Sequence, residues 1–315
     1  MSVAQLYQTV RAEIAKVVFG QEEVVEFALA SLFSSGHVLL EGPPGVAKTL
    51  LVRTIAATLD LEYRRVQMTP DLLPGDITGS SVFREGTATF EFRRGPLFAN
   101  FVLADEINRA SARTQSALLE AMQELCVTHD GVTHSLPEPF IVFATQNPIE
   151  QDGTYPLPLA QLDRFMFKVR VDYPSDEEER RILQLHHGSG GLSDPRRMGV
   201  AAIVKAEHIL EARQAIRQTH IREEVAAYVQ RLLAATRRDD SLSVGASPRA
   251  GLMLLMGAKS LAQFAGRDFV TPDDVQTAFR PALRHRVVLH PTSELEGTTP
   301  DEVLADVLEA VEVPR

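Results

Sequence analysis

The stretch that decides the fold is HVLLEGPPGVAKTLLVRT, which runs from His37 to Thr54. An apolar run gives way to Gly and Pro residues, and the apolar pattern returns after a Lys-Thr pair. This is the pattern G-x-x-x-x-[G/A]-K-[ST] between a strand and a helix, in which backbone N–H groups and the helix N-terminus surround a phosphate. The stretch therefore predicts a phosphate-binding loop, whereas the alternative is a Gly-Pro turn before an unrelated helix.

The positions of this loop have separate predicted roles. Gly42 and Gly45 let the backbone approach a ligand without a side-chain collision. Lys48 is expected between the β- and γ-phosphates of ATP, and the Thr49 hydroxyl is expected to coordinate Mg²⁺. Ala47 stands where Gly is usual, but this position begins the helix, where φ is ordinarily negative, so we expect its methyl group to be tolerated. The predicted nucleotide-binding residues of the loop are Gly42, Pro43, Pro44, Gly45, Val46, Ala47, Lys48, Thr49 and Leu50.

Length and composition limit the class of protein. A chain of 315 residues with 44% hydrophobic residues exceeds the comfortable size of one core, so we expect two domains. The formal net charge of -10 argues against a protein whose main task is to neutralise nucleic-acid phosphates. Cys126 is the single cysteine, and charged residues interrupt the first twenty positions where a signal peptide needs an apolar segment. We predict a cytoplasmic protein without membrane insertion.

Short apolar runs alternate with helical patterns in the first half of the chain, which is typical of a parallel sheet wrapped by helices. The expected strands are His37–Glu41, Glu62–Gln67, Asn100–Asp105, Phe140–Gln146 and Phe165–Val171, and the expected helices are Gln21–Phe33, Lys48–Leu59 and Ser111–Glu124. From Asp176 on, the pattern is helix and loop without strands. We therefore predict an α/β P-loop NTPase domain of three layers with a central parallel sheet at residues 1–173, and an all-α lid domain at residues 174–315.

Two further segments alternate apolar and polar residues around a turn signal. Ser80–Leu97 does so around Glu85-Gly86, and Leu125–Leu136 does so around Asp130-Gly131, a pair favoured in two-residue hairpins. We predict two β-hairpin insertions in the α/β domain.

Polar side chains follow two of the expected strands. Asn100–Asp105 ends in the pair Asp105-Glu106, in which one carboxylate can hold Mg²⁺ while the other polarises a water for attack on the γ-phosphate. A bare Asp-Glu pair is common and usually only solvated, but its place after an apolar strand favours catalysis. Asn147 follows the strand Phe140–Gln146 and can orient the attacking water; the alternative is an Asx turn before Pro148.

At this point the sequence resembles the AAA+ ATPases and, within them, the MoxR family, over nearly the whole chain. The segments that carry the resemblance are FGQEEVVE (19–26), GPPGVAKT, LADEINRA, QSALLEAMQE, ATQNPIEQDGTYPLPLAQLDRF (144–165) and GASPRA (245–250). The resemblance implies ATP hydrolysis, a homo-oligomeric and commonly hexameric ring, and nucleotide contacts from Gly20 and Gln21. It also implies an arginine finger at Arg164 in LDRF and a sensor-2 arginine at Arg249 in GASPRA.

Both arginines also suit the chemistry, because a planar guanidinium can meet two of the oxygens on which hydrolysis concentrates charge. Arg164 is expected to face a neighbouring subunit, and Arg249 to begin a lid helix after Ser247-Pro248. The alternative for each is a surface salt bridge. Arg109 and Arg113 are weaker candidates for contacts between subunits.

The resulting expectation is an ATPase of the MoxR type that remodels or matures protein clients, including metalloenzymes, together with a partner that carries a von Willebrand factor A domain. In similar proteins the two hairpins face the pore of the ring; the alternative is two static surface hairpins. A magnesium-chelatase-like motor subunit and an MCM-like helicase remain as rival classes. Nucleic acid is disfavoured because the first hairpin is nearly balanced in charge. The histidines His129, His134, His186 and His187 lack the spacing of a metal site.

Overall fold

The computed structural model describes residues 1–86, 88–148, 154–186 and 194–314. Its centre is a five-stranded sheet with strand order β2-β5-β8-β1-β9, and every neighbouring pair of strands in it is parallel. The strands are β1 (Val38–Glu41), β2 (Tyr63–Gln67), β5 (Phe101–Asp105), β8 (Ile141–Gln146) and β9 (Phe167–Arg170). All five expected strands are thus confirmed, with ends that differ by one or two residues.

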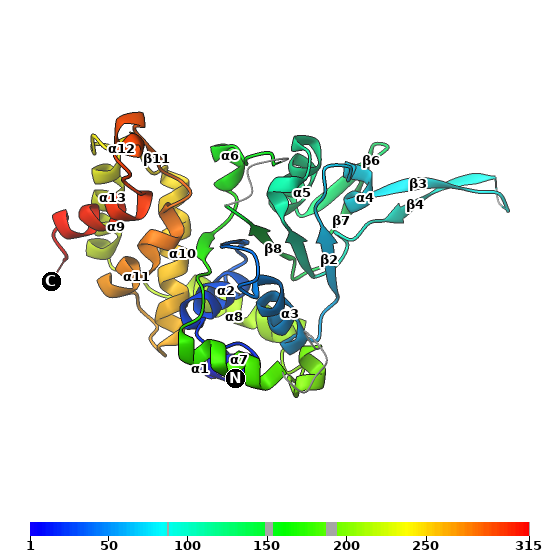
Figure 1. Ribbon diagram of the computed structural model, residues 1–315, viewed down its shortest axis with the longest axis horizontal. Helices are drawn as coiled ribbons and strands as arrows, with labels where there is room; N and C mark the ends of the chain where they lie inside the picture. The colour runs from blue at the N-terminus through cyan, green and yellow to red at the C-terminus, as the bar shows by residue number, and fades with distance from the viewer. Residues whose placement is uncertain (87, 149–153, 187–193, 315) are drawn as a thin grey trace.

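Helices cover both faces of this sheet (Figure 1). Because successive strand residues point to opposite faces, alternate apolar residues of β1, β5 and β8 enter two different cores. Leu39, Val102 and Val142 pack with the apolar stripe of α5 (Ala112–Glu124). Val38, Phe101 and Phe143 pack on the other side with α2 (Glu22–Phe33) and α3 (Lys48–Thr58), which are covered in turn by α1 (Val3–Ile14). The three-layer α/β prediction is confirmed.

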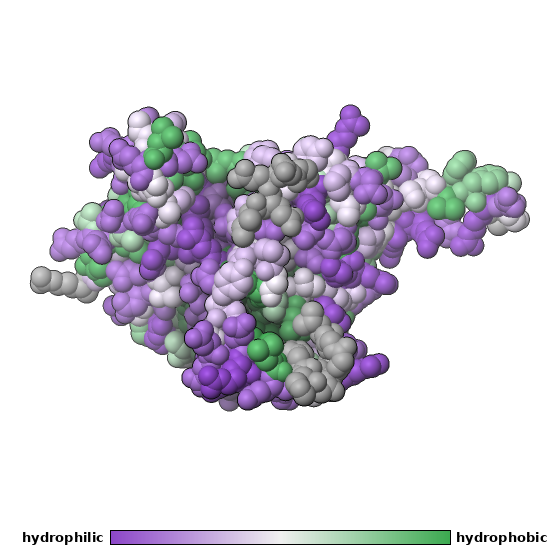
Figure 2. All heavy atoms as spheres, in the orientation of Figure 1, coloured by the Kyte–Doolittle hydropathy of each residue, from purple (hydrophilic) through white to green (hydrophobic). Residues whose placement is uncertain are grey.

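Both predicted hairpins are present. The first consists of β3 (Gly79–Arg84) and β4 (Thr89–Arg94), follows α4 (Pro74–Thr78) and projects from the body of the molecule (Figure 1). The second consists of β6 (Cys126–His129) and β7 (Val132–Ser135), and it turns at Asp130-Gly131, where both φ angles are positive. The two hairpins meet where the ring of His134 stacks on Phe92 with 4.4 Å between ring centroids. Near the far end of the first hairpin, hydrophobic residues lie exposed beside hydrophilic ones (Figure 2), and Phe90 is 74% exposed.

The C-terminal part of the chain is mainly helical. Its elements are α7 (Asp176–His186), the 3-10 turn η2 (Pro195–Met198), α8 (Ala206–Gln218), α9 (Glu223–Thr236), α10 (Pro248–Phe264), α11 (Pro272–Leu283), α12 (Pro291–Leu295) and α13 (Pro300–Ala310). The prediction that strands stop after Pro174 is wrong in one respect, because β10 (Leu242–Val244) pairs with β11 (Val288–Leu289) as an antiparallel ribbon. These strands are only a few residues long, too short to show a period-two pattern.

The two parts of the chain are broadly joined. Helix α8 contacts both α2 and α10, and α1 contacts α10 through Tyr7, whose ring stacks on Phe264 at 4.0 Å. The boundary between residues 173 and 174 therefore stays a prediction. Within the described residues, no helix combines the length and apolar character that crossing a bilayer requires.

A buried histidine lies at the amino end of the sheet. The ring of His37 is fixed as one neutral tautomer, because Nδ1 accepts from the Val142 N–H at 3.0 Å and Nε2 lies 3.2 Å from the Met122 carbonyl oxygen. If Nδ1 of His37 were protonated, its N–H would face the N–H of Val142, and two donors cannot form a hydrogen bond. Desolvation by burial, opposed by the Met122 carbonyl and supported by the nearby charge of Arg213, lowers the pKa of His37 to about 4.

We expect this histidine to make the protein less stable as pH falls. Between about pH 6.5 and 4 the unfolded chain binds a proton at His37 that the folded chain does not, so the free energy of unfolding decreases through that window. The full shift corresponds to roughly 3 kcal/mol. Urea unfolding at pH 7 and pH 5 measures the part of this loss that occurs above pH 5, about 2 kcal/mol, in the wild type and in His37→Gln, whose amide cannot titrate. An equal loss of stability in both proteins would contradict the assignment.

Candidate active site

The predicted phosphate-binding loop connects the carboxyl end of β1 to the N-terminus of α3, as expected from the sequence. Lys48 opens α3, and its Nζ turns back to donate to the carbonyl oxygens of Gly42 and Pro43. A Cβ at Gly42 would lie 2.2 Å from the Val171 carbonyl oxygen, so the close approach of the residue that follows β9 already requires glycine there. At Gly45 it is the backbone that requires glycine, since φ is +86°.

Ala47 corrects one expectation. This residue precedes α3 in the left-handed conformation, with φ +60° and ψ 23°, rather than with the negative φ expected of a helix start. Such a conformation costs an L-residue about 1–2 kcal/mol, which explains why Gly is usual at this position. The methyl group is accommodated, but at the expense of local backbone strain.

Asp105, at the end of β5, lies at the centre of a hydrogen-bond network. Its side chain is 7% exposed. Its Oδ1 accepts from the Thr145 hydroxyl at 2.6 Å, and its Oδ2 lies 3.2 Å from Oγ1 of Thr49. Arg65 of β2 donates to the same Oδ2 through Nε at 3.0 Å and Nη2 at 2.7 Å. The structure thus brings together Asp105 and Thr49, the two predicted magnesium ligands.

Glu106 follows Asp105 with a positive φ of +58°. Its backbone N–H donates to the Thr145 hydroxyl at 2.8 Å, which links the turn to β8. Its carboxylate accepts from Nε2 of Gln67 at 2.8 Å and from Nη1 of Arg109 at 3.2 Å. Arg109, in the 3-10 turn η1 (Ile107–Arg109), therefore contacts a predicted catalytic residue of its own chain.

Asn147 comes directly after β8, and its side chain is buried. The register pairs Glu41 of β1 with Gln146 of β8, so Asn147 lies beside the start of the phosphate-binding loop. The Gly42 N–H donates to the Gln146 carbonyl oxygen at 3.3 Å, which joins the two segments. Polar ends of β1, β5 and β8 therefore meet at one sheet edge, where α/β proteins bind ligands.

Sequence reasoning missed three residues of this site: Arg65, Gln67 and Thr145. Arg65 and Gln67 lie two positions apart on β2 and are joined by a hydrogen bond of 2.6 Å from Nη2 to Oε1. In the sequence, Arg65 and Gln67 appear only as alternate polar residues of a short strand. Such a pattern is also typical of a strand with one face in solvent. Thr145 is a buried hydroxyl that follows four apolar residues of β8, and that signal could have found it.

The two predicted arginines lie close to Asp163. Arg164 lies between the short helix α6 (Leu159–Leu162) and β9, and it lines a groove of about 590 Å³ that also contains Glu120 and Glu124 of α5. Arg249 lies in the first turn of α10, which Ser247 caps by accepting from the Ala250 N–H at 3.1 Å. The Nε atom of Arg249 lies 3.7 Å from Oδ2 of Asp163, the neighbour of Arg164.

Gly20 and Gln21 come just before α2. Gly20 has a positive φ of +67°, and Nε2 of Gln21 donates to the Asp172 carbonyl oxygen at 3.2 Å. This bond ties the start of α2 to the chain after β9. The contact of these two residues with nucleotide stays a prediction.

The oxygen atoms of Asp105 and Thr49 suit a magnesium ion. Mg²⁺ prefers hard oxygen ligands, and it is typically held by one or two carboxylates together with substrate phosphates. The part of the chain that the structure describes contains no group of three or more His, Cys, Asp or Glu side chains placed to hold a metal. His187 lies outside the described residues.

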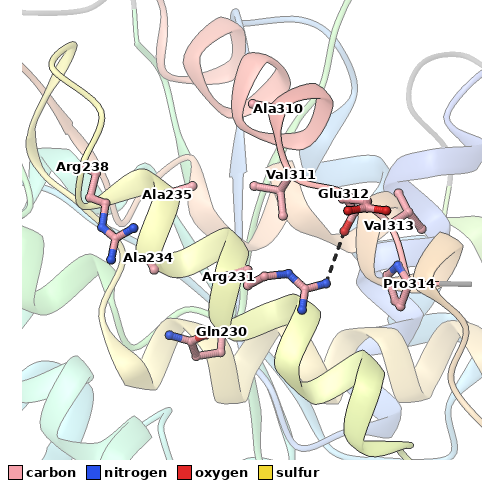
Figure 3. A pocket seen from close by; sticks show the side chains of 10 residues that line it. All are labelled: Gln230, Arg231, Ala234, Ala235, Arg238, Ala310, Val311, Glu312, Val313 and Pro314. Atoms are coloured by element: carbon pink, nitrogen blue, oxygen red, sulfur yellow. Dashed lines mark hydrogen bonds between the residues drawn. The ribbon is translucent and has the colours of Figure 1, made fainter.

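A separate groove of about 740 Å³ lies between α9 and residues 310–314 of the C-terminal segment (Figure 3). Nη2 of Arg231 crosses it to donate to the Glu312 carbonyl oxygen at 3.2 Å. None of the predicted site residues lines it.

Comparison with known proteins shows which proteins this chain is related to. Residues 37–167 match the ATPase family associated with various cellular activities (AAA), and residues 234–307 match an AAA lid domain. The chain is 44% identical to the chaperone MoxR1 of Mycobacterium tuberculosis, over 96% of this chain and 81% of that protein. It is 42% identical to the uncharacterised protein YeaC of Bacillus subtilis, over 96% and 92%.

A third relative is protein MoxR of Methylorubrum extorquens, with 32% identity over 95% of this chain and 91% of the relative. A crystal structure from Cytophaga hutchinsonii, described as a candidate ATPase, superposes with a TM-score of 0.90 at 40% identity and covers 99% of this chain and 97% of that one. The loop, the sheet edge and the lid define an AAA ATPase, which hydrolyses ATP. Within that class, the chain belongs to the MoxR family.

Proposed function

We propose that ATP is held by residues 42–50 and cleaved by groups at the carboxyl edge of the sheet. The observation that carries this proposal is the convergence of Thr49, the pair Asp105-Glu106 and Thr145, which come from three separate segments. Lys48 would neutralise the β- and γ-phosphates. Thr49 and Asp105 would hold Mg²⁺, which supplies charge stabilisation for the phosphates.

In this proposal Glu106 acts as the general base. Its carboxylate accepts a proton from the attacking water, and Asn147 orients that water by hydrogen bonding. Gln67 and Arg109 already donate to the Glu106 carboxylate and so fix its direction. Thr145 connects the two acids, because its hydroxyl bonds Asp105 and accepts from the Glu106 N–H.

In this proposal a neighbouring subunit supplies the further positive charge that stabilises the transferring phosphoryl group. We assign Arg164 as the arginine finger and Arg249 as the sensor-2 arginine in a homo-oligomeric ring, for which a hexamer is the expected size. Two facts support a joint role: Arg249 contacts Asp163, and Asp163 directly precedes Arg164. Activity would then depend on assembly.

The output we propose is remodelling or maturation of protein clients, in the cytoplasm, together with a partner that carries a von Willebrand factor A domain. Identity to a protein named as a chaperone supports this proposal. So do two exposed phenylalanines of the first hairpin, Phe83 at 50% and Phe90 at 74% exposure. A magnesium-chelatase-like motor subunit is the second candidate, since it would need the same ATP site.

ATP-dependent capture tests the client assignment. The Glu106→Gln protein, held in its ATP state, is used as bait with ATP or ADP, and bound proteins are identified by mass spectrometry. We expect a protein with a von Willebrand factor A domain to be enriched with ATP and lost when Phe83 and Phe90 are both changed to Ser. Enrichment of nucleic acid or of metal-insertion enzymes would favour a rival class. Light scattering of the same sample measures the size of the ring.

A further inference from the structure

A buried arginine of the lid holds the chain on both sides of Arg164. Arg286 lies in the turn after α11 and is 3% exposed. A guanidinium has five N–H donors in a fixed planar fork, and in Arg286 every nitrogen of that fork is used. This number of bonds from one buried side chain to one short segment sets Arg286 apart from a surface salt bridge.

The acceptors lie almost entirely in residues 163–166. Nε donates to Oδ1 of Asp163 at 2.6 Å, and Nη2 donates to the carbonyl oxygens of Asp163 at 3.0 Å and Phe165 at 2.5 Å. Nη1 donates to the Met166 carbonyl oxygen at 3.0 Å and also to that of Ala282. The neighbouring His285 adds a contact of 3.0 Å between Nε2 and the Phe165 oxygen. Arg164 is the one residue of this segment that Arg286 does not bind.

The same segment is fixed by packing. The side chains of Phe165 and Met166 are 0% and 1% exposed, so both point into the core. Arg164 lines the outer groove instead, beside Glu120 and Glu124. The direction in which Arg164 leaves the surface is therefore set by the bonds and contacts of its flanking residues.

Stability alone gives little reason for this arrangement. Burial lowers the pKa of Arg286, and the hydrogen bond and charge of Asp163 oppose that shift. A buried ion pair is often no more stabilising than apolar side chains of the same volume. A planar fork that fixes several carbonyl oxygens does, however, define a backbone position more sharply than apolar packing.

We propose that Arg286 is a positioning residue for Arg164, and that through it the lid of one subunit sets the reach of that subunit's arginine toward the nucleotide of the next. This inference rests on the proposed role of Arg164. Any rotation of the lid against the sheet must carry residues 163–166 with it or break the bonds of Arg286.

Arg286→Lys tests the proposal, because it keeps the charge but cannot form the planar fork. We expect turnover at saturating ATP to fall by about 10²-fold, the effect of displacing a catalytic group by roughly 1 Å. Affinity for a fluorescent ATP analogue and the mass of the assembly should stay as in the wild type. The matched control is Arg284→Gln, at a position two residues before Arg286. This change removes the ion pair between Arg284 and Asp301 and leaves residues 163–166 unchanged.

A mixture of two variant subunits distinguishes a positioning role of Arg286 from a general loss of structure in the Arg286→Lys protein. Arg286→Lys subunits keep an intact site of their own, so Glu106→Gln subunits, which bring well-placed arginines, should restore activity above the sum of the two parts. The double variant Arg164→Ala/Arg286→Lys should be no slower than Arg164→Ala alone. Lack of restoration, or additive losses in the double variant, would overturn the proposal.

The outcome also separates this inference from the function on which it rests. If Arg164→Ala is slow while Arg286→Lys is fully active, only the positioning role fails. If Arg164→Ala itself turns over normally, the finger assignment fails first. Should Arg286→Lys not fold, Arg286→Gln carries the same set of measurements, since its amide lacks the planar fork and leaves no unpaired charge buried.

Discussion

Replacement of Glu106 by Gln should leave ATP binding close to the wild-type value and reduce turnover by roughly 10²- to 10⁴-fold, the usual contribution of a general base. The amide keeps the shape of the carboxylate, and its oxygen can still accept from Nε2 of Gln67, which now donates at 2.8 Å. The amide cannot take a proton from water. Steady-state phosphate release and titration calorimetry with ATP measure the two quantities.

The control for this variant is Glu62→Gln. Glu62 pairs with the exposed Arg64 at the start of β2, at the end of the strand away from Gln67. It should retain wild-type turnover. Unchanged phosphate release in Glu106→Gln would remove the catalytic assignment, and loss of ATP binding in that variant would show that the carboxylate serves the pocket rather than the reaction.

Arg164→Ala should lower turnover by about 10³-fold, because an arginine that meets the transferring phosphoryl group is worth that much or more. Since the arginine would act on the next subunit, a neighbouring subunit with an intact Arg164 should restore turnover. A mixture of Arg164→Ala and Glu106→Gln subunits contains interfaces at which an intact Glu106 faces an intact Arg164. Phosphate release by the mixture should therefore exceed that of either variant alone.

Arg181→Ala is the matched control for the arginine, because Arg181 lies on the surface of α7 and pairs with Glu177, four residues before it in the same helix. Its removal should change nothing in turnover or assembly. A mixture of the two catalytic variants that is no more active than its parts would place Arg164 outside the shared site, provided that light scattering shows mixed assemblies.

The elements of the fold could be predicted because their signals are local. The strand, loop and helix around Lys48 read directly from the apolar runs and the glycines, and the hairpin at Asp130-Gly131 follows from a turn pair with positive φ at both positions. The ribbon of β10 and β11 could not be predicted, since strands of a few residues have no period. The backbone at Ala47 was also misjudged, because its φ is set by the geometry of the loop and not by the residue.

The residues of the candidate site also fall into those with a local sequence signal and those without one. Lys48, Thr49, Asp105 and Glu106 were expected from motifs, and the structure brings Thr49 and Asp105 within 3.2 Å. Arg65 and Gln67 were missed because a polar residue on an edge strand has many possible reasons. Their partners on β5 lie some forty positions along the chain and become neighbours only through the register of the sheet.

By itself the sequence predicted which residues bind phosphate and showed which strands end in acids, because glycine, lysine and paired carboxylates have a characteristic chemistry. The tertiary structure decided how these groups are connected. It brings β2 beside β5, so that Arg65 and Gln67 reach the two acids, and it folds the lid back so that Arg286 holds the residues around Arg164. The physical reason is that hydrogen bonds act over about 3 Å, and distant segments come that close only when parallel strands and packed helices fix them.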